Sequence, residues 1–251
     1  MKVTNRTFTA AAIVGAVIVG LTAGRLFAAP QGPAGPVAPA EPLTGFGMAS
    51  KPPTSAVMLF TGKPEQIAAN FYKRYSKTDG DWTVDGEAAT PNKDDLTSKV
   101  EFGDCYVHAE FKCAVDANGK SIGEGNSGIG LHGRYEVQIL DSYGNVNPGA
   151  GDAGALYSQK APMANPSKKP GEWQKLDIVF RAPRFDGSGT VVEKPRATVF
   201  FNGVIVQNNT EFNGPTGIQY GEFKGMTKTG PIVLQGDHSP VSFRNVWAVS
   251  L

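Results

Sequence analysis

The sequence predicts an all-β fold, an antiparallel sandwich of short strands, on the basis of three observations. The 251 residues include 31 glycines and 18 prolines, residues that are typical of tight turns. Many segments alternate between apolar and polar residues, as a strand with one buried face does. Turn signals recur about every dozen residues, which is the spacing found in sandwiches and barrels.

The elements are expected in the following order. A short strand at 56–60 precedes the segment 62–75, which is expected to form a helical turn or a loop. In the segment 82–90, Asp85-Gly86 marks a turn between two extended pieces, and Asn202-Gly203 marks a type I′ hairpin turn. Long loops are expected at 141–172 and 207–230, and loops of that length are uncommon without a function. The other expected strands lie at 104–115, 128–140, 172–183, on both sides of that hairpin turn within 196–207, at 230–236 and at 241–251.

The N-terminal segment has a different composition from the rest of the chain. In residues 1–29, a basic start, an apolar run at 8–24 and small residues follow one another, which is the layout of a secretory signal peptide. An uncleaved membrane anchor is the alternative, because about 17 apolar residues are the lower limit for a spanning helix. Residues 30–54 are rich in proline and are expected to form an extended tether, and residues 55–251 fit one domain.

The protein is therefore expected to be exported to the periplasm or the extracellular space. Any membrane attachment is expected to go through the N-terminal segment alone. The formal net charge is +1, which argues against a nucleic acid as partner. Nothing in the sequence predicts the oligomeric state.

The two cysteines, Cys105 and Cys113, are expected to be free buried thiols. They lie in one expected strand, where eight residues span about 26 Å. The Cα atoms of a disulfide lie within about 7 Å of each other, so these two cannot pair with each other. Both share a face with apolar residues, where a thiol packs as a small hydrophobe.

Polar side chains form rows on two of the expected strands. Because apolar residues occupy the other face of each strand, the polar rows are expected to point away from the core. We expect the two rows to line one surface, a groove of carbohydrate size on the concave side of a sheet, joined by Gln235 and Asp237. The first row is Tyr106, His108, Glu110 and Lys112, and the second is His132, Arg134, Glu136 and Gln138.

Five motifs, in this order and spacing, resemble the 3-keto-disaccharide hydrolase domain family, also described as 3-keto-glucoside lyase and hydratase domains. They are NSGIGLHGRYEVQILDSYG, GALYSQKAP, GEWQKLDIVFRAPRFD, FNGVIVQNN and LQGDHSPVSFRNVWAV. The resemblance covers roughly residues 55–251. It implies a jelly-roll sandwich of the concanavalin A-like lectin and glucanase type. It also implies cleavage of glycosides whose sugar carries a ketone at carbon 3, so the expected ligand is a 3-keto-glycoside or another sugar. Gly130 stands where relatives often carry an aromatic residue, which leaves the substrate preference open.

A ketone at carbon 3 acidifies the hydrogen on carbon 2, so a base can remove that hydrogen and expel the group on carbon 1. The reaction needs a base, a stabiliser of the enolate oxygen and an acid for the leaving group. His132 and Glu136 are the two candidates for the base, and His238 or Glu110 for the acid. The candidates for substrate binding are Glu110, Arg134, Gln138, Gln235 and Asp237.

Each of these residues has a structural alternative. Glu136 and Arg134 are residue types that also form ion pairs with neighbouring strands, and Asp237 and His238 are types that also cap a turn. A carbohydrate-binding module without turnover is the alternative function, since one fold supports both.

No cofactor is predicted for the domain. His132 and Glu136 lie about 13 Å apart along a strand, too far to hold one metal ion by themselves. A divalent cation held by groups from several strands stays open as an alternative stabiliser of the enolate.

Overall fold

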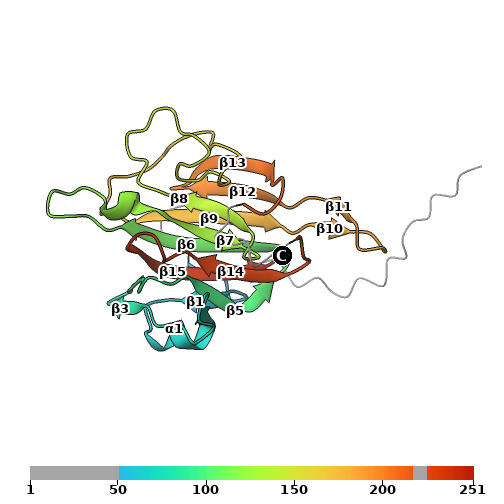
Figure 1. Cartoon of the computed structure of the whole chain (residues 1–251), viewed down its shortest axis with the longest axis horizontal. Coiled ribbons are helices and arrows are strands. Elements are labelled where there is room, and N and C mark those ends of the chain that lie inside the picture. Colours follow the sequence, from blue (N-terminus) through green and yellow to red (C-terminus); the bar gives the residue numbers. More distant parts are fainter. Residues whose placement is uncertain (1–50, 217–224) are drawn as a thin grey trace, which may run out of the picture. The chain divides into compact units, whose positions relative to one another are not determined.

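The computed structural model describes residues 51–216 and 225–251 (Figure 1). Residues 1–29 and nearly all of the expected tether lie outside the described residues. The described residues form two antiparallel β-sheets that pack face to face as a jelly-roll sandwich, as the sequence predicts. No helix among them is long and apolar enough to cross a membrane.

The larger sheet, sheet A, contains eight strands. Strand β6 lies near the middle of this sheet, between β9 and β15 (Figure 1). In spatial order the strands are β13 (Val204–Glu211), β12 (Arg196–Phe201), β9 (Gln174–Arg181), β6 (Cys105–Cys113), β15 (Val241–Ser250), β4 (Ala88–Thr90) and β3 (Thr83–Asp85), and β1 (Val57–Phe60) pairs with β15.

The smaller sheet, sheet B, contains five strands. In spatial order they are β2 (Phe71–Lys73), β5 (Leu96–Phe102), β14 (Gly230–Leu234), β7 (Ser127–Leu131) and β8 (Tyr135–Ile139). The short helices α1 (Glu65–Asn70) and η1 (Ile122–Gly125) lie in connections, and β10 (Arg184–Phe185) and β11 (Val191–Glu193) form a separate hairpin that projects from the sandwich (Figure 1).

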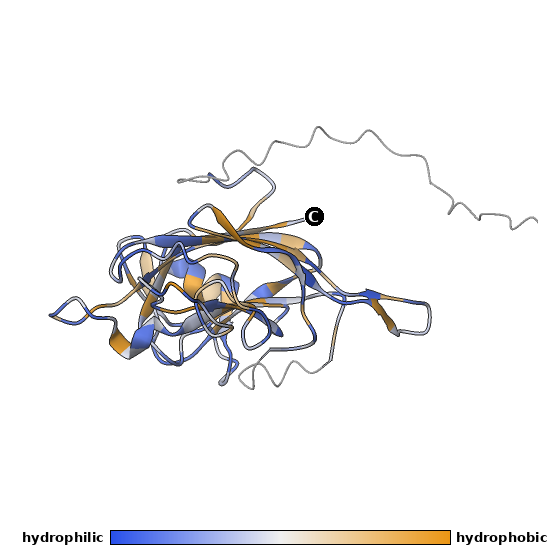
Figure 2. Ribbon diagram, turned by 90° about the horizontal axis from the view of Figure 1, so that it is seen from above, coloured by the Kyte–Doolittle hydropathy of each residue, from blue (hydrophilic) through white to orange (hydrophobic). Residues whose placement is uncertain are grey.

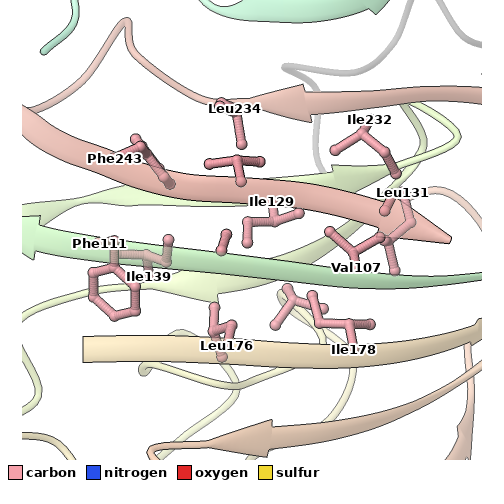
Figure 3. Packing of buried hydrophobic residues seen from close by; sticks show 14 of the residues in the cluster. Val107, Phe111, Ile129, Leu131, Ile139, Leu176, Ile178, Ile232, Leu234 and Phe243 are labelled. Carbon is pink, nitrogen blue, oxygen red and sulfur yellow. The ribbon is translucent and has the colours of Figure 1, made fainter. Parts of the chain in front are cut away.

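The core lies between the inner faces of the two sheets. Val107 and Ile178 of sheet A and Ile129 and Leu234 of sheet B all point into it (Figure 3). Hydrophobic residues follow the strands, whereas the loops are mainly hydrophilic (Figure 2). Complete burial of one such side chain stabilises the fold by about 1.5–3 kcal/mol relative to exposure. The alternation in the sequence therefore decides which face of each strand looks outward.

Several expectations about local structure are confirmed. Asp85-Gly86 is the turn between β3 and β4. Asn202 and Gly203 have φ angles of 47° and 83°, and a type I′ turn requires positive φ at both positions. Cys105 and Cys113 are free and buried.

The prediction of one continuous strand at 128–140 is wrong. The segment is a hairpin of β7 and β8, because His132 and Gly133 have φ angles of 53° and 62°. The Arg134 amide donates a 3.0 Å hydrogen bond to the Leu131 carbonyl and closes the turn. Histidine is among the residues that tolerate this left-handed conformation better than most.

The prediction that both polar rows line one surface is also wrong. Strand β6 belongs to sheet A and strand β8 to sheet B. Since both strands turn their apolar faces toward the same core, their polar faces point in opposite directions. Alternation fixes which side chains face outward, but it does not show which sheet contains a strand.

Candidate active site on sheet B

The outer face of sheet B carries glycines on its β7 strand. Ile129 and Leu131 of β7 point into the core, so Gly128 and Gly130 occupy the outward positions. Gly130 pairs with Glu136 of β8, and Gly128 pairs with Gln138. A glycine inside a strand often marks a place where a ligand comes close to the backbone.

Glu136 is a buried carboxylate on this face. The residue is 1 % exposed, and its side chain lies over Gly128, where a β-carbon would overlap it. The Glu136 amide donates a 3.0 Å hydrogen bond to Thr216 Oγ1, and its carbonyl accepts one of 3.1 Å from the Tyr157 amide. A carboxylate is seldom buried without a structural or functional reason.

The same face of sheet B carries further buried polar atoms that have no hydrogen-bond partner among the described residues. They are Oε1 of Gln138, both side-chain polar atoms of Gln235, and Oγ1 of Thr97. The other polar atom of Gln138, Nε2, donates a 3.1 Å hydrogen bond to Asn126 Oδ1. Since nearly all buried polar groups in proteins are paired with protein or water, these atoms are available to a polar ligand or to water. We call Thr97, Asn126, Glu136, Gln138 and Gln235 the sheet B polar cluster.

The strand register brings this cluster together. The backbone amide of Gln235 donates a 3.0 Å hydrogen bond to the Gly128 carbonyl, which places Gln235 beside Gly128 on the β14 side. Gln138 stands opposite Gly128 on the β8 side. The two glutamines are therefore on strands about 10 Å apart with a glycine between them, a spacing suited to one sugar ring.

Asp237 lies beyond the end of β14 and is held from two sides. Its Oδ2 accepts a 2.7 Å hydrogen bond from the Tyr75 hydroxyl, and its amide donates to Asp95 Oδ1 over 3.3 Å. Asp95 in turn binds Arg74 in a fully buried ion pair of 2.9 Å, and burial raises the pKa of Asp95. The half-exposed His238 has its Nδ1 atom 3.5 Å from Asp237 Oδ1. Asp237 and His238 thus share the end of the sheet that follows Gln235.

His132 and Arg134 do not share the row of Glu136, because the chain turns at 132 and 133. The His132 ring is buried edge-on against Phe180, with centroids 4.8 Å apart, and its Nε2 atom is 3.1 Å from the Gly103 carbonyl oxygen. Burial lowers the pKa of His132, so the ring is neutral. Arg134 donates to the carbonyls of His132 and Gly225. These contacts give both side chains a role in holding the turn.

Glu110 lies on sheet A, separated from the sheet B polar cluster by the core. It accepts hydrogen bonds from Arg244 Nε at 2.7 Å and from Asn245 Nδ2 at 3.0 Å. Regular alternation would put Arg244 and Asn245 on opposite faces of β15, but both reach Glu110. The register shifts between Arg244 and Trp247, and Asn245 has a φ angle of 46°, so a bulge turns both side chains toward Glu110.

The sequence interpretation missed Thr97, Asn126, Thr216, Tyr75 and Asp95. Thr97 lies in an alternating segment, so a search for further outward polar positions would have found it. Asn126 and Thr216 lie in loops, where no periodicity indicates the direction of a side chain. Among the residues that the structure describes, no group of three or more His, Cys, Asp and Glu side chains is arranged to hold a metal ion.

Residues 56–249 match the 3-keto-alpha-glucoside-1,2-lyase-like domain family. The chain belongs to this family. It is 34% identical to a candidate glycosyl hydrolase from Parabacteroides distasonis ATCC 8503, with a TM-score of 0.66 over 79% of this chain and 84% of that one. A second candidate glycosyl hydrolase of the same organism is 23% identical, with a TM-score of 0.54 over 78% and 99% of the two chains, and supports the fold alone. No curated protein matches the chain.

The family match confirms the resemblance that the five motifs indicate. It makes the chain a carbohydrate-active protein of hydrolase-like or lyase-like type. The part of the fold that the motif around Glu136 builds is the hairpin of β7 and β8.

Proposed function

We propose that the protein cleaves 3-keto-glycosides at the sheet B polar cluster, with Glu136 as the base. One observation carries the proposal. A buried carboxylate shares the outer face of sheet B with buried polar atoms of Gln138, Gln235 and Thr97 that have no partner among the described residues. A polar ligand with several hydroxyl groups would pair these atoms, and its acidic hydrogen would face the carboxylate.

The proposed reaction has two steps, an elimination and a hydration. Glu136 takes the proton from carbon 2, and the electrons of that C–H bond form an enolate with the ketone oxygen. The enolate collapses to a C1–C2 double bond and expels the oxygen on carbon 1, which takes up a proton. Water then adds across the double bond, its hydroxyl to carbon 1 and a proton to carbon 2, so the net reaction is hydrolysis.

The other residues take roles that fit their atoms. The side-chain amide of Gln235 donates a hydrogen bond to the ketone oxygen, where negative charge develops. The Oε1 atom of Gln138 accepts a hydrogen bond from a sugar hydroxyl. His238, half-exposed beside Asp237, gives the proton to the leaving oxygen. Glu110 takes no part, since it lies on sheet A.

The test uses a 3-keto-glucoside with a chromogenic leaving group, the same compound with deuterium on carbon 2, and the unoxidised parent. We expect turnover of the ketone alone and slower turnover of the deuterated compound, because the C2–H bond breaks. Glu136→Gln should lower kcat by about 10²- to 10⁴-fold. The exposed Glu65→Gln is the matched control.

Three results would contradict the proposal. Turnover of the parent without the ketone would indicate ordinary glycoside hydrolysis. Sugar binding without turnover of either compound would identify a carbohydrate-binding module. Equal rates for Glu136→Gln and wild type would remove Glu136 as the base.

No cofactor is part of this proposal. Dialysis against EDTA should leave kcat unchanged. A loss of activity that a divalent cation restores would assign enolate stabilisation to that cation in place of Gln235.

Export is a second part of the proposal, and it rests on the residue pattern of the leader. Expression of the full chain in a bacterium, followed by cell fractionation and N-terminal sequencing, tests it. We expect a mature chain that begins near residue 30 in the periplasm or the medium. A full-length chain in the membrane fraction would favour an uncleaved anchor.

A further inference from the structure

The outer face of sheet A carries a cavity of about 290 Å³ on the side of the core opposite to the sheet B polar cluster. Lys168, Trp173, Lys175 and Arg244 line it, together with Glu110. Its volume is at the lower end of the range for small-molecule sites, about 300 Å³. The cavity therefore suits a ligand of the size of one sugar.

The described lining of this cavity contains three cations and one carboxylate. The carboxylate, Glu110, is engaged by Arg244 and Asn245. Hydrogen bonding, above all with His108, lowers the pKa of Glu110 to about 2, so it is ionised. Arg244 also pairs with Glu87 Oε2 at 3.7 Å, and the whole chain has a net charge of only +1, so the positive charge at this cavity comes from its lysines.

Two lysines add positive charge beside the pair of Arg244 and Glu110. Lys168 Nζ donates a 3.0 Å hydrogen bond to the Trp173 carbonyl, which is an uncharged partner. Lys175 Nζ lies 3.7 Å from Asp177 Oδ2. The other oxygen of Asp177 accepts hydrogen bonds of 2.6 Å from Tyr106 and His108, so Asp177 is shared between several donors.

The cationic groups are fixed in place before any ligand arrives. The Arg244 guanidinium stacks 4.2 Å from the centre of the Trp173 ring and is tied to Glu110. The backbone of Lys168 is anchored, because its amide donates to Gln174 Oε1 over 2.8 Å, and Gln174 is itself bound by Asn202. Preorganised donors lose less entropy on binding than mobile ones.

We propose that this cavity binds the carboxylate of an acidic sugar such as a hexuronate. Arginine and lysine are the usual partners of carboxylates, and the family is carbohydrate-active, which makes a sugar acid the natural source of the carboxylate. Binding here does not depend on the proposed elimination chemistry, because sheet A and sheet B are separated by the core.

The test uses NMR of the three tryptophan indole groups in the intact protein. D-glucuronate is titrated into the wild type, with acetate and D-glucose as comparison ligands. We expect glucuronate to shift the indole signal of Trp173 more than those of Trp82 and Trp247. Lys168→Ala and Lys175→Met should weaken this binding roughly tenfold each, since each removes a bond to a charged group.

The controls separate the two faces of the protein. The exposed Lys63→Ala and the variant Glu136→Gln should bind glucuronate at this cavity like the wild type. Lys168→Ala should also keep wild-type turnover of a 3-keto-glucoside, while Lys175→Met needs a circular dichroism spectrum to show that it folds.

Several outcomes would overturn the inference. If glucose bound as tightly as glucuronate, the cavity would not recognise the carboxylate charge. If acetate bound as tightly as glucuronate, the cavity would not recognise the sugar ring. The inference would also be wrong if glucuronate did not shift the Trp173 signal. It would be wrong as well if wild type, Lys168→Ala and folded Lys175→Met bound glucuronate equally tightly.

Discussion

Glu136 lies directly over Gly128 and fills the space that a side chain at residue 128 would need. Gly128→Ala should therefore push the carboxylate aside while the strand still forms. We expect kcat/KM for a 3-keto-glucoside to fall at least tenfold, since a displacement of about 1 Å can cost 10²-fold. Gly151→Ala is the control, because nothing lies within 4 Å of a β-carbon there. Equal activity of the two variants would show that the position of Glu136 is not critical.

Gln235 combines burial with two side-chain polar atoms that have no partner among the described residues, so we expect its side-chain amide to lower the stability of the fold. Gln235→Leu should raise the free energy of unfolding by about 1 kcal/mol and weaken substrate binding. Urea denaturation and KM measurements check the two effects.

Gln207 offers a matched comparison for Gln235. It is equally buried, but its Nε2 atom donates to the carbonyls of Gly154 and Ala161. Gln207→Leu should lower the free energy of unfolding by about 1–3 kcal/mol. A loss of similar size in Gln235→Leu would mean that its amide is satisfied in the free protein.

His132 is expected to stabilise the hairpin rather than to act on the substrate. Asparagine also tolerates a positive φ, so His132→Asn should keep the turn but lose the packing against Phe180. We expect a loss of about 1–3 kcal/mol in unfolding free energy and a kcat close to that of the wild type. If this variant kept its stability but lost much of its kcat, His132 would have a direct role in catalysis.

Glu110 should make stability depend on pH. Its pKa in the folded protein is about 2, below its ordinary value of 4.5, so its contribution is present above pH 4.5 and is lost as the pH falls toward 2. Glu110→Gln should cost about 1–3 kcal/mol at pH 7, and urea denaturation should show this cost shrinking between pH 4.5 and 2. A cost that stays constant over this range would mean that the charge is not responsible.

The two thiols should be inert in the folded protein. Burial raises the pKa values of Cys105 and Cys113 to about 12, and the thiolate is the reactive form. A thiol reagent should label neither cysteine in buffer and both in urea. Rapid labelling of either one without denaturant would show local opening of β6.

The sequence predicts the fold and the family well, because alternation and turn residues are local signals. The outward direction of Glu136 and Gln138 follows from Val137 between them. The break of the same segment at His132 was missed, since Leu-His-Gly-Arg lacks the usual asparagine or aspartate of a two-residue hairpin turn.

The assignment of strands to sheets could not be predicted from local patterns. Glu110 and Glu136 occupy equivalent places in two similar polar rows, and only the long-range pairing of β6 with β9 and β15 separates them. The direction of Asn245 was equally inaccessible, because a bulge changes the alternation of β15 without a proline or glycine to mark it.

The two outer faces are held apart by a core about 10 Å thick, and this separation has a practical consequence. Coupling chemistry directed at lysines beside the cavity on sheet A would attach the protein to a solid support with sheet B turned toward the solution. An immobilised preparation of this kind should retain its turnover, whereas attachment through residues near Gln235 should abolish it.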